Sequence, residues 1–247
     1  MPSTDSGLPL EPDTTPPLPR WRGRVLAEPT IEGLFDAMAS DLMLEAIDAV
    51  TGHGTFHFAI GGSESLQPLL ERLMLDPGLR GMPWEHTHIW QADEQCALEG
   101  EAGVAWARIH DMLVPHAGLT RHQLHPMPAG DEIAPEHYAK RLHRALEGRH
   151  VDCLLLDAGE DGRIGGMAPG QAFGGDDVAF TKVHDQDVIT LTPVAAARAC
   201  VYVLVPSSLA RRRLDRDMTA EASPTARLLR HGSRMHWCIP SEALQTK

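Results

Sequence analysis

The order of apolar and polar residues divides the chain into strand-like and helix-like segments. Short apolar runs that end in glycine or acidic residues predict buried strands, and apolar residues that recur every three or four positions predict helices. The predicted strands are residues 55–60, 86–91, 151–156, 188–192, 199–205 and 234–239. The predicted helices are residues 30–50, 66–74, 104–113, 135–146, 207–214 and 224–229. Strands and helices therefore alternate along most of the chain.

This alternation determines the fold class that we expect. A strand, a glycine turn and a helix form the first half of a βαβ unit, and repetition of that unit builds a parallel sheet. We therefore predict an α/β fold with a single doubly wound, mainly parallel sheet and helices on both faces. In such a fold the loops at the carboxyl ends of the strands meet at one cleft, where ligands bind.

Residues 1–20 differ from the rest of the chain. They contain six prolines and few residues that could pack against a core, a composition typical of a flexible arm. We expect residues 21–247 to form the folded domain. Its first helix has clear ends, because Thr30 can accept a hydrogen bond at the N-terminus and Gly52-His53-Gly54 stops the helical pattern.

Charge and hydropathy limit the partners of the protein. The 247 residues carry a formal net charge of −12. This argues against nucleic acid or an anionic membrane as the main partner, although a small anion can still bind at a local positive site. No apolar run approaches the roughly 18 residues that span a bilayer, and the N-terminus lacks a basic segment followed by an apolar one. We expect a cytoplasmic protein; nothing in the sequence indicates its oligomeric state.

The four cysteines are expected to be reduced and largely inaccessible. They lie far apart in the sequence, without a CxxC pair, and most of them fall in strand-like apolar stretches. They are Cys96, Cys153, Cys200 and Cys238.

Three polar segments follow predicted strands and are expected at the same edge of the sheet. They are Gly61-Gly62-Ser63, Asp93-Glu94 and Gly159-Glu160-Asp161-Gly162-Arg163. Glycines allow a phosphate or a sugar to approach the backbone, and the amides at the start of a following helix can bind it. Each segment alone is also common in ordinary turns and solvated loops, so the three are considered together.

Together the three segments resemble the signature segments of the 6-phosphogluconolactonase family, within the glucosamine/galactosamine-6-phosphate isomerase-deaminase superfamily. That family typically reads SGGSTP, then W-x-x-DER, then LLGMGEDGHTASLFPG. Here residues 60–65 read IGGSES, residues 90–95 read WQADEQ and residues 155–163 read LLDAGEDGR. Residues 189–192, 224–228 and 236–237 are similar to the family's RITLT, PAxxL and C-terminal tryptophan segments, so the resemblance covers about residues 22–244. Glucosamine-6-phosphate deaminases, which usually read DEY and GxNGHIAFNEP, fit less well.

The resemblance implies hydrolysis of 6-phosphoglucono-1,5-lactone, in the pentose phosphate pathway, without a metal or a cofactor. In the family a histidine of the Asp-Gly-His turn is thought to activate water, while arginines, a lysine and backbone amides hold the phosphate. Carried over to this chain, Asp93, Glu94 and Asp161 would shape the site and orient water or sugar hydroxyls. The backbone around a bound sugar phosphate or sugar acid would come from Gly61, Gly62, Ser63, Gly159 and Gly162.

Several positions depart from the family pattern. The expected histidine is Arg163, whose guanidinium cannot act as a base, although it can bind phosphate or stabilise an oxyanion. Three cationic positions of the family are lost, and Glu64-Ser65 replaces Thr-Pro beside the glycine turn. The three losses are at Gln95, Val188 and Leu209. Each charge-assisted hydrogen bond is worth about 1.5–3 kcal/mol, so we expect a degraded site in which Arg163 is the one remaining cation.

Histidines elsewhere offer two further hypotheses. His184 precedes the predicted strand 188–192 and could reach the site from a loop as a replacement base. His86 and His88 would lie on one face of a strand, but no third ligand is close in sequence, so we expect no metal site there. The basic run Arg211-Arg212-Arg213 is typical of a solvated helix face.

Two functions remain open on the sequence alone. The first is 6-phosphogluconolactonase-type hydrolysis with a degraded active site. The alternative is a non-catalytic family member, a pseudoenzyme, that binds a sugar acid, another metabolite or a protein. We expect weak or absent lactone hydrolysis, and Arg163→His is expected to raise it if the cleft otherwise survives.

Overall fold

The computed structural model describes residues 17–96, 104–128, 130, 133–218, 220 and 223–245. The strands are β1 (Arg24–Glu28), β2 (Phe56–Ile60), β3 (Thr87–Gln91), β4 (Asp93–Gln95), β5 (Leu124–His125), β6 (Cys153–Asp157), β7 (Val178–Val183), β8 (Gln186–Leu191), β9 (Cys200–Leu204) and β10 (Arg234–Pro240). The α-helices are α1 (Ile31–His53), α2 (Gln67–Leu75), α3 (Val104–Ala117), α4 (Ala134–Leu146), α5 (Ser208–Asp217), α6 (Pro224–Arg230) and α7 (Ser241–Leu244). Four 3₁₀ turns are η1 (Glu64–Leu66), η2 (Pro77–Leu79), η3 (Trp84–His86) and η4 (Arg121–Gln123). Residues 1–16 of the predicted arm lie outside the described residues.

Seven parallel strands form the central sheet, in the order β1-β10-β9-β6-β2-β3-β5. Strands β2, β6 and β9 lie in the middle, and all their residues are buried, as is typical of a sheet covered on both faces. From β2 the chain winds towards β5, and from β6 it winds towards the other edge. The winding therefore changes between β2 and β6, where doubly wound sheets bind ligands. The predicted α/β fold class is confirmed.

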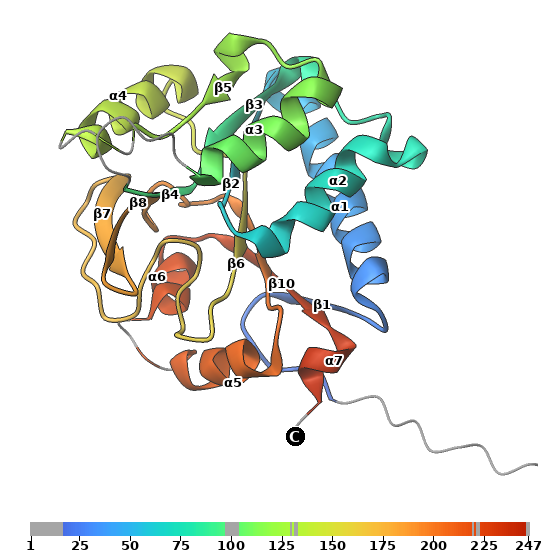
Figure 1. Cartoon of the computed structure of the whole chain (residues 1–247), viewed down its shortest axis with the longest axis vertical. Helices are drawn as coiled ribbons and strands as arrows, with labels where there is room; N and C mark the ends of the chain where they lie inside the picture. Colours follow the sequence, from blue (N-terminus) through green and yellow to red (C-terminus); the bar gives the residue numbers. More distant parts are fainter. Residues whose placement is uncertain are drawn as a thin grey trace, which may run out of the picture.

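Helices cover both faces of this sheet (Figure 1). Helices α1, α2 and α3 share one core with the alternate strand residues Phe58, Leu155 and Tyr202. Helices α4, α5, α6 and α7 share a second core with strand residues of the opposite face, such as Leu154 and Val203. Because neighbouring residues of a strand point to opposite faces, continuous apolar strands supply both cores.

A second, smaller sheet corrects one prediction. Strand β8 was predicted as part of the main sheet at residues 188–192, but it pairs antiparallel with β7 and β4 in a three-stranded sheet. The reason is the two-residue turn between β7 and β8. His184 and Asp185 both adopt positive φ angles, 49° and 64°, as a tight hairpin turn requires. This hairpin places His184 at its tip.

The long first helix has the ends that the sequence predicts. The Thr30 hydroxyl oxygen accepts a hydrogen bond from the Gly33 amide at 3.0 Å. At the other end Gly54 has a φ of 87°, and its amide donates to the Val50 carbonyl at 2.8 Å. Helix α1 therefore stops at the predicted glycine.

The four cysteines are all free thiols. Cys153, Cys200 and Cys238 are buried in the central sheet, and burial raises the pKa of the Cys200 thiol to about 12. Cys96 follows the short β4 and is partly exposed, contrary to the expectation that all four are inaccessible. Among the described helices, none is both long and apolar enough to cross a membrane.

Candidate active site

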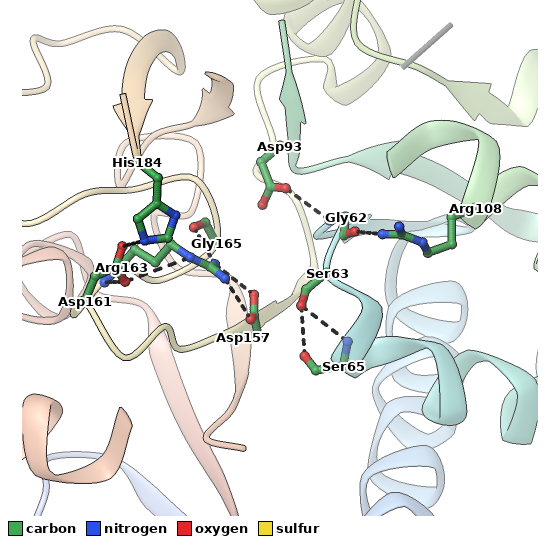
Figure 2. Close-up of polar contacts among 10 residues, drawn as sticks. All are labelled: Gly62, Ser63, Ser65, Asp93, Arg108, Asp157, Asp161, Arg163, Gly165 and His184. Carbon is green, nitrogen blue, oxygen red and sulfur yellow. Dashed lines mark hydrogen bonds and ion pairs between the residues drawn. The ribbon is translucent and has the colours of Figure 1, made fainter. Parts of the chain in front are cut away.

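A cavity of about 260 Å³ opens where the winding of the sheet changes. Its walls come from the loops after β2, β3 and β6, from helix α3 and from the tip of the β7–β8 hairpin. Figure 2 shows two polar groups facing each other, with Asp93, Gly62 and Arg108 opposite Asp157, Arg163 and His184. The sequence-predicted residues that line the cavity are Gly62, Ser63, Asp93, Glu94, Arg163 and His184. The predicted segments therefore converge, although Gly61, Gly159, Asp161 and Gly162 do not form its wall.

The glycine turn after β2 brings the backbone close to helix α3. A Cβ atom added at Gly62 would lie 2.2 Å from the Cβ of Ala105, so this position has room only for glycine. The Ser63 side chain accepts a hydrogen bond from the Ser65 amide at 3.3 Å and thereby caps η1. The turn thus has a clear structural role in addition to its place in the cavity wall.

Asp93 is one of the carboxylates in the cavity wall. Its Oδ1 accepts a hydrogen bond from the Gly62 amide at 3.0 Å. Its Oδ2 lies 3.3 Å and 3.0 Å from the places where Gly61 and Gly165 would carry a Cβ, so the surrounding glycines enclose it closely. Burial raises the pKa of Asp93 to about 6, and the nearby charge of Asp157 adds to this effect. The carboxyl group of Asp93 therefore holds its proton to a higher pH than a solvated aspartate does.

Glu94 has a structural task that the sequence did not predict. Its carboxylate accepts hydrogen bonds from the amides of Ala105 and Trp106 in the first turn of α3, at 3.3 and 2.9 Å. It also accepts from Gln91 Nε2 and from the Gln95 amide. Both oxygens are occupied in a residue that is 1% exposed. Glu94 therefore fixes the start of α3, and through it the position of the cavity wall.

Arg163 forms an ion pair with Asp157, the last residue of β6. Its guanidinium nitrogens lie 3.2 and 3.3 Å from the two carboxylate oxygens, and Nη1 also donates to the Gly165 carbonyl. Burial lowers the pKa of Arg163, but the neighbouring carboxylates of Asp157 and Asp161 outweigh this effect and raise the pKa above its usual value. In the family motif quoted above, glycine stands at position 157 and histidine at position 163. The two residues that depart from the motif, Asp157 and Arg163, are therefore paired with each other. A substrate anion has to compete with Asp157 for the guanidinium.

Asp161 connects Arg163 with His184. Its Oδ2 lies 3.3 Å from His184 Nε2, and its Oδ1 accepts a hydrogen bond from the Arg163 amide at 3.2 Å. His184 stands at the hairpin tip and lines the cavity. Asp161 does not line the cavity, but it contacts an imidazole that does, and the His184 side chain is 73% exposed. The hairpin turn thus brings His184 to the same side of the cavity as Arg163, which stands where the family motif has histidine.

Arg108 is a second cation in the cavity wall, so the prediction that Arg163 is the one remaining cation is wrong. Its Nη1 donates to the Gly62 carbonyl at 2.5 Å, and its Nη2 pairs with Glu64 at 2.9 Å. The helical spacing of Val104, Ala105 and Arg108 was the signal that could have found it, because positions one turn apart share a face. Its partner Glu64 is one of the departures from the family pattern.

The other departures fall into two groups. Gln95 and Val188 line the cavity, so the charges that the family carries there are lost from the site itself. Leu209 lies exposed on α5 and is not part of the cavity wall. Among the described residues, no group of three or more His, Cys, Asp or Glu side chains could hold a metal ion, and His88 instead stacks between His57 and His125.

The fold and the site define a class of protein: an α/β protein with a polar cavity at the switch point of its sheet. A family model described as glucosamine-6-phosphate isomerases/6-phosphogluconolactonase matches residues 29–237, and the chain belongs to this family.

Known proteins are similar to this chain in sequence, and a solved structure is similar to it in fold. The GDH/6PGL endoplasmic bifunctional protein of Homo sapiens is 25% identical over 248 residues, which cover 91% of this chain and 30% of that protein. The protein of the same name from Oryctolagus cuniculus is 28% identical over 158 residues, covering 61% and 20%. The chain thus spans less than a third of the length of these relatives. A solved 6-phosphogluconolactonase from Thermotoga maritima has a TM-score of 0.73 at 17% identity, covering 88% of this chain and 99% of its own.

Proposed function

We propose that this protein hydrolyses a sugar-phosphate lactone, nominally 6-phosphoglucono-1,5-lactone, at a reduced rate. The family assignment and the names of its relatives support the reaction type. The observation that carries the proposal is the convergence of Asp93, Arg163 and His184 on one small cavity. The cytoplasmic location expected from the sequence stays a prediction, since the curated relatives are named as endoplasmic proteins.

The chemistry needs a group that takes a proton from water. In our account His184 takes that proton while the water oxygen attacks the lactone carbonyl carbon. The ring ester bond then breaks, and the ring oxygen leaves as a hydroxyl because His184 returns to it the proton that it took from water. Asp161 positions His184 through the 3.3 Å contact. Arg108 and Arg163 supply positive charge for the phosphate and for the negative carbonyl oxygen of the intermediate.

Two contacts explain why we expect a slow reaction. Arg163 is already paired with Asp157, and Arg108 is already paired with Glu64. A substrate anion must therefore share each guanidinium with a carboxylate of the protein. Gln95 and Val188 add no positive charge at the cavity wall. We expect these ion pairs and missing charges to weaken substrate binding more than they disturb the geometry of water attack.

The test is hydrolysis of freshly generated lactone, followed by NMR and corrected for spontaneous opening. We expect acceleration by the protein and competitive inhibition by 6-phosphogluconate. His184→Ala should reduce the rate, whereas His116→Ala, an exposed histidine on α3, should leave it unchanged. A protein that does not accelerate the reaction would contradict the proposal.

The second candidate is a non-catalytic member of the family that binds a sugar acid. The ion pair between Arg163 and Asp157 favours it, because this pair fills the place where the family has its catalytic histidine. One experiment distinguishes the two candidate functions. Calorimetric binding of 6-phosphogluconate without any turnover of the lactone would support the binding protein over the enzyme.

A further inference from the structure

A second cavity lies on the other side of helix α3. It has a volume of about 700 Å³ and opens at β5, the edge strand of the central sheet. Figure 1 shows β5 between helices α3 and α4, which supply walls of this edge cavity. Trp106, His110 and Val114, spaced four residues apart on α3, face the edge cavity, whereas Ala105 and Arg108 line the candidate active site. The two cavities are therefore distinct and share one helix.

The charge of the edge cavity is opposite to that of the whole chain. Among the described residues its wall contains Arg121, Arg141 and three histidines but no carboxylate, while the chain carries a net charge of −12. The Arg121 side chain has no ion-pair or hydrogen-bond partner within the described part of the chain. Arg141 is held in place, because it donates to the Pro126 carbonyl and lies 5.0 Å above the Tyr138 ring. One fixed and one free guanidinium suit an anion.

The remaining wall is largely aromatic or apolar. Trp106 is partly exposed there, and its ring lies 6.3 Å from that of His110. His125 also lines the cavity, and its ring stacks on that of Trp90 with 3.7 Å between the ring centroids. Burial lowers the pKa of His125 to about 3, so its ring is neutral at physiological pH. Aromatic and neutral imidazole faces bind planar rings by stacking.

We propose that the edge cavity binds a nucleotide, with the phosphate on Arg121 and Arg141 and the base against Trp106. Its volume lies within the range of small-molecule sites. A lone phosphate would use the arginines but would leave the aromatic wall uncovered. A neutral nucleoside would leave two arginines without an anion. The site is separate from the proposed lactone chemistry and does not depend on it.

The test is calorimetric titration of the full chain with the four common nucleoside 5′-monophosphates, each compared with its nucleoside and with inorganic phosphate. We expect at least one monophosphate to bind with a dissociation constant below about 1 mM, and at least tenfold more tightly than its nucleoside or phosphate. Arg121→Glu should weaken binding at least tenfold and Trp106→Leu at least fivefold. Arg80→Glu, at an exposed arginine after η2, and His184→Ala should leave it unchanged.

Three results would overturn the proposal. The first is no binding of any monophosphate at 5 mM. The second is binding of inorganic phosphate as tight as that of the monophosphate, which would show an anion site without recognition of the base. The third is binding that Arg121→Glu and Trp106→Leu leave unchanged, or that His184→Ala abolishes, because the ligand would then occupy another cavity.

Discussion

At the scale of single residues, the arginine at position 163 has to be considered together with the aspartate at position 157. Asp157 is 4% exposed, and Arg163 contacts both of its oxygens. The family motif shows the histidine position directly, but the partnership becomes visible only when β6 and the turn after it are folded. The sequence alone predicted that Arg163→His raises activity. The ion pair with Asp157 changes that prediction.

Arg163→His is now expected to destabilise the protein by about 3 kcal/mol without raising hydrolysis, because it leaves Asp157 buried without its partner. Asp157→Gly with Arg163→His should recover most of that stability and raise the rate of lactone opening by about 10²-fold. Urea unfolding and initial rates measure the two effects. A single Arg163→His variant that is both stable and faster would contradict the role given to Asp157.

Asp93 is a residue where stability and function oppose each other. Its pKa is raised from 3.8 to about 6 in the folded protein, so the folded state binds this proton more tightly than the unfolded state. The free energy of unfolding therefore decreases as the pH rises from about 4 to about 6. Asp93→Asn keeps an oxygen for the Gly62 amide and removes the buried charge.

We expect Asp93→Asn to raise the free energy of unfolding by about 2–3 kcal/mol at pH 7.5, with little effect at pH 3.5. The same change should lower lactone hydrolysis. Urea unfolding at both pH values checks this, with Asp111→Asn, at an exposed aspartate on α3, as the control. An equal gain at both pH values would show that desolvation of the carboxylate is not the cause.

At the scale of elements, helix α3 depends on a close approach to the turn after β2. Gly62 allows that approach, since a methyl group there would overlap Ala105. Glu94 fixes the start of the helix. The sequence indicated a glycine turn and a helix, but their contact joins residues more than forty positions apart and has no local signal.

Gly62→Ala is expected to cost about 1–3 kcal/mol through overpacking and to lower activity by moving α3. Gly52→Ala is the matched control, because nothing lies within 4 Å of a Cβ atom at that helical position. It should increase stability by roughly 0.5–1 kcal/mol. Thermal unfolding of both variants measures the difference. Equal effects would mean that Gly62 does not hold α3 in place.

Neighbouring strands also build a buried histidine stack from His57, His88 and His125. Their rings stack in sequence, and His88 Nδ1 lies 3.1 Å from His125 Nε2. Burial lowers the pKa values of His57 and His125 to about 3, helped by neighbouring cationic groups. The unfolded chain therefore binds more protons than the folded protein between about pH 6.5 and pH 3. The free energy of unfolding decreases as the pH is lowered across this window.

Between pH 7 and pH 5 we expect the free energy of unfolding to fall by about 2 kcal/mol for each of these two histidines. Urea unfolding at both pH values measures the loss. His125→Gln should remove about half of the contribution of the two histidines, and His116→Gln, on the exposed side of α3, should remove none. The raised pKa of Asp93 acts in the opposite direction in this window, so the comparison of variants decides: a pH dependence that is the same in His125→Gln and in the natural protein would show that the stack does not titrate in this way.

At the scale of the whole molecule, five of the seven strands of the main sheet were predictable because their signals are local, whereas its edge strands β1 and β5 were missed. Apolar runs, glycine turns and helical spacing follow each other in chain order, and both faces of a parallel sheet need such runs. The small antiparallel sheet was missed because its turn, His184-Asp185, contains no glycine and β4 has only three residues. The same hairpin delivers His184 to the cavity, so the least predictable element carries the proposed base.

The most direct test of the account compares lactone opening by the natural protein and by His184→Ala at pH 7, under identical correction for spontaneous hydrolysis. The account predicts measurable acceleration by the natural protein and a loss of about 10²-fold in His184→Ala. His116→Ala should match the natural protein. Acceleration that survives His184→Ala, or no acceleration by the natural protein, would contradict the claim that the β7–β8 hairpin supplies the base of a lactone hydrolase.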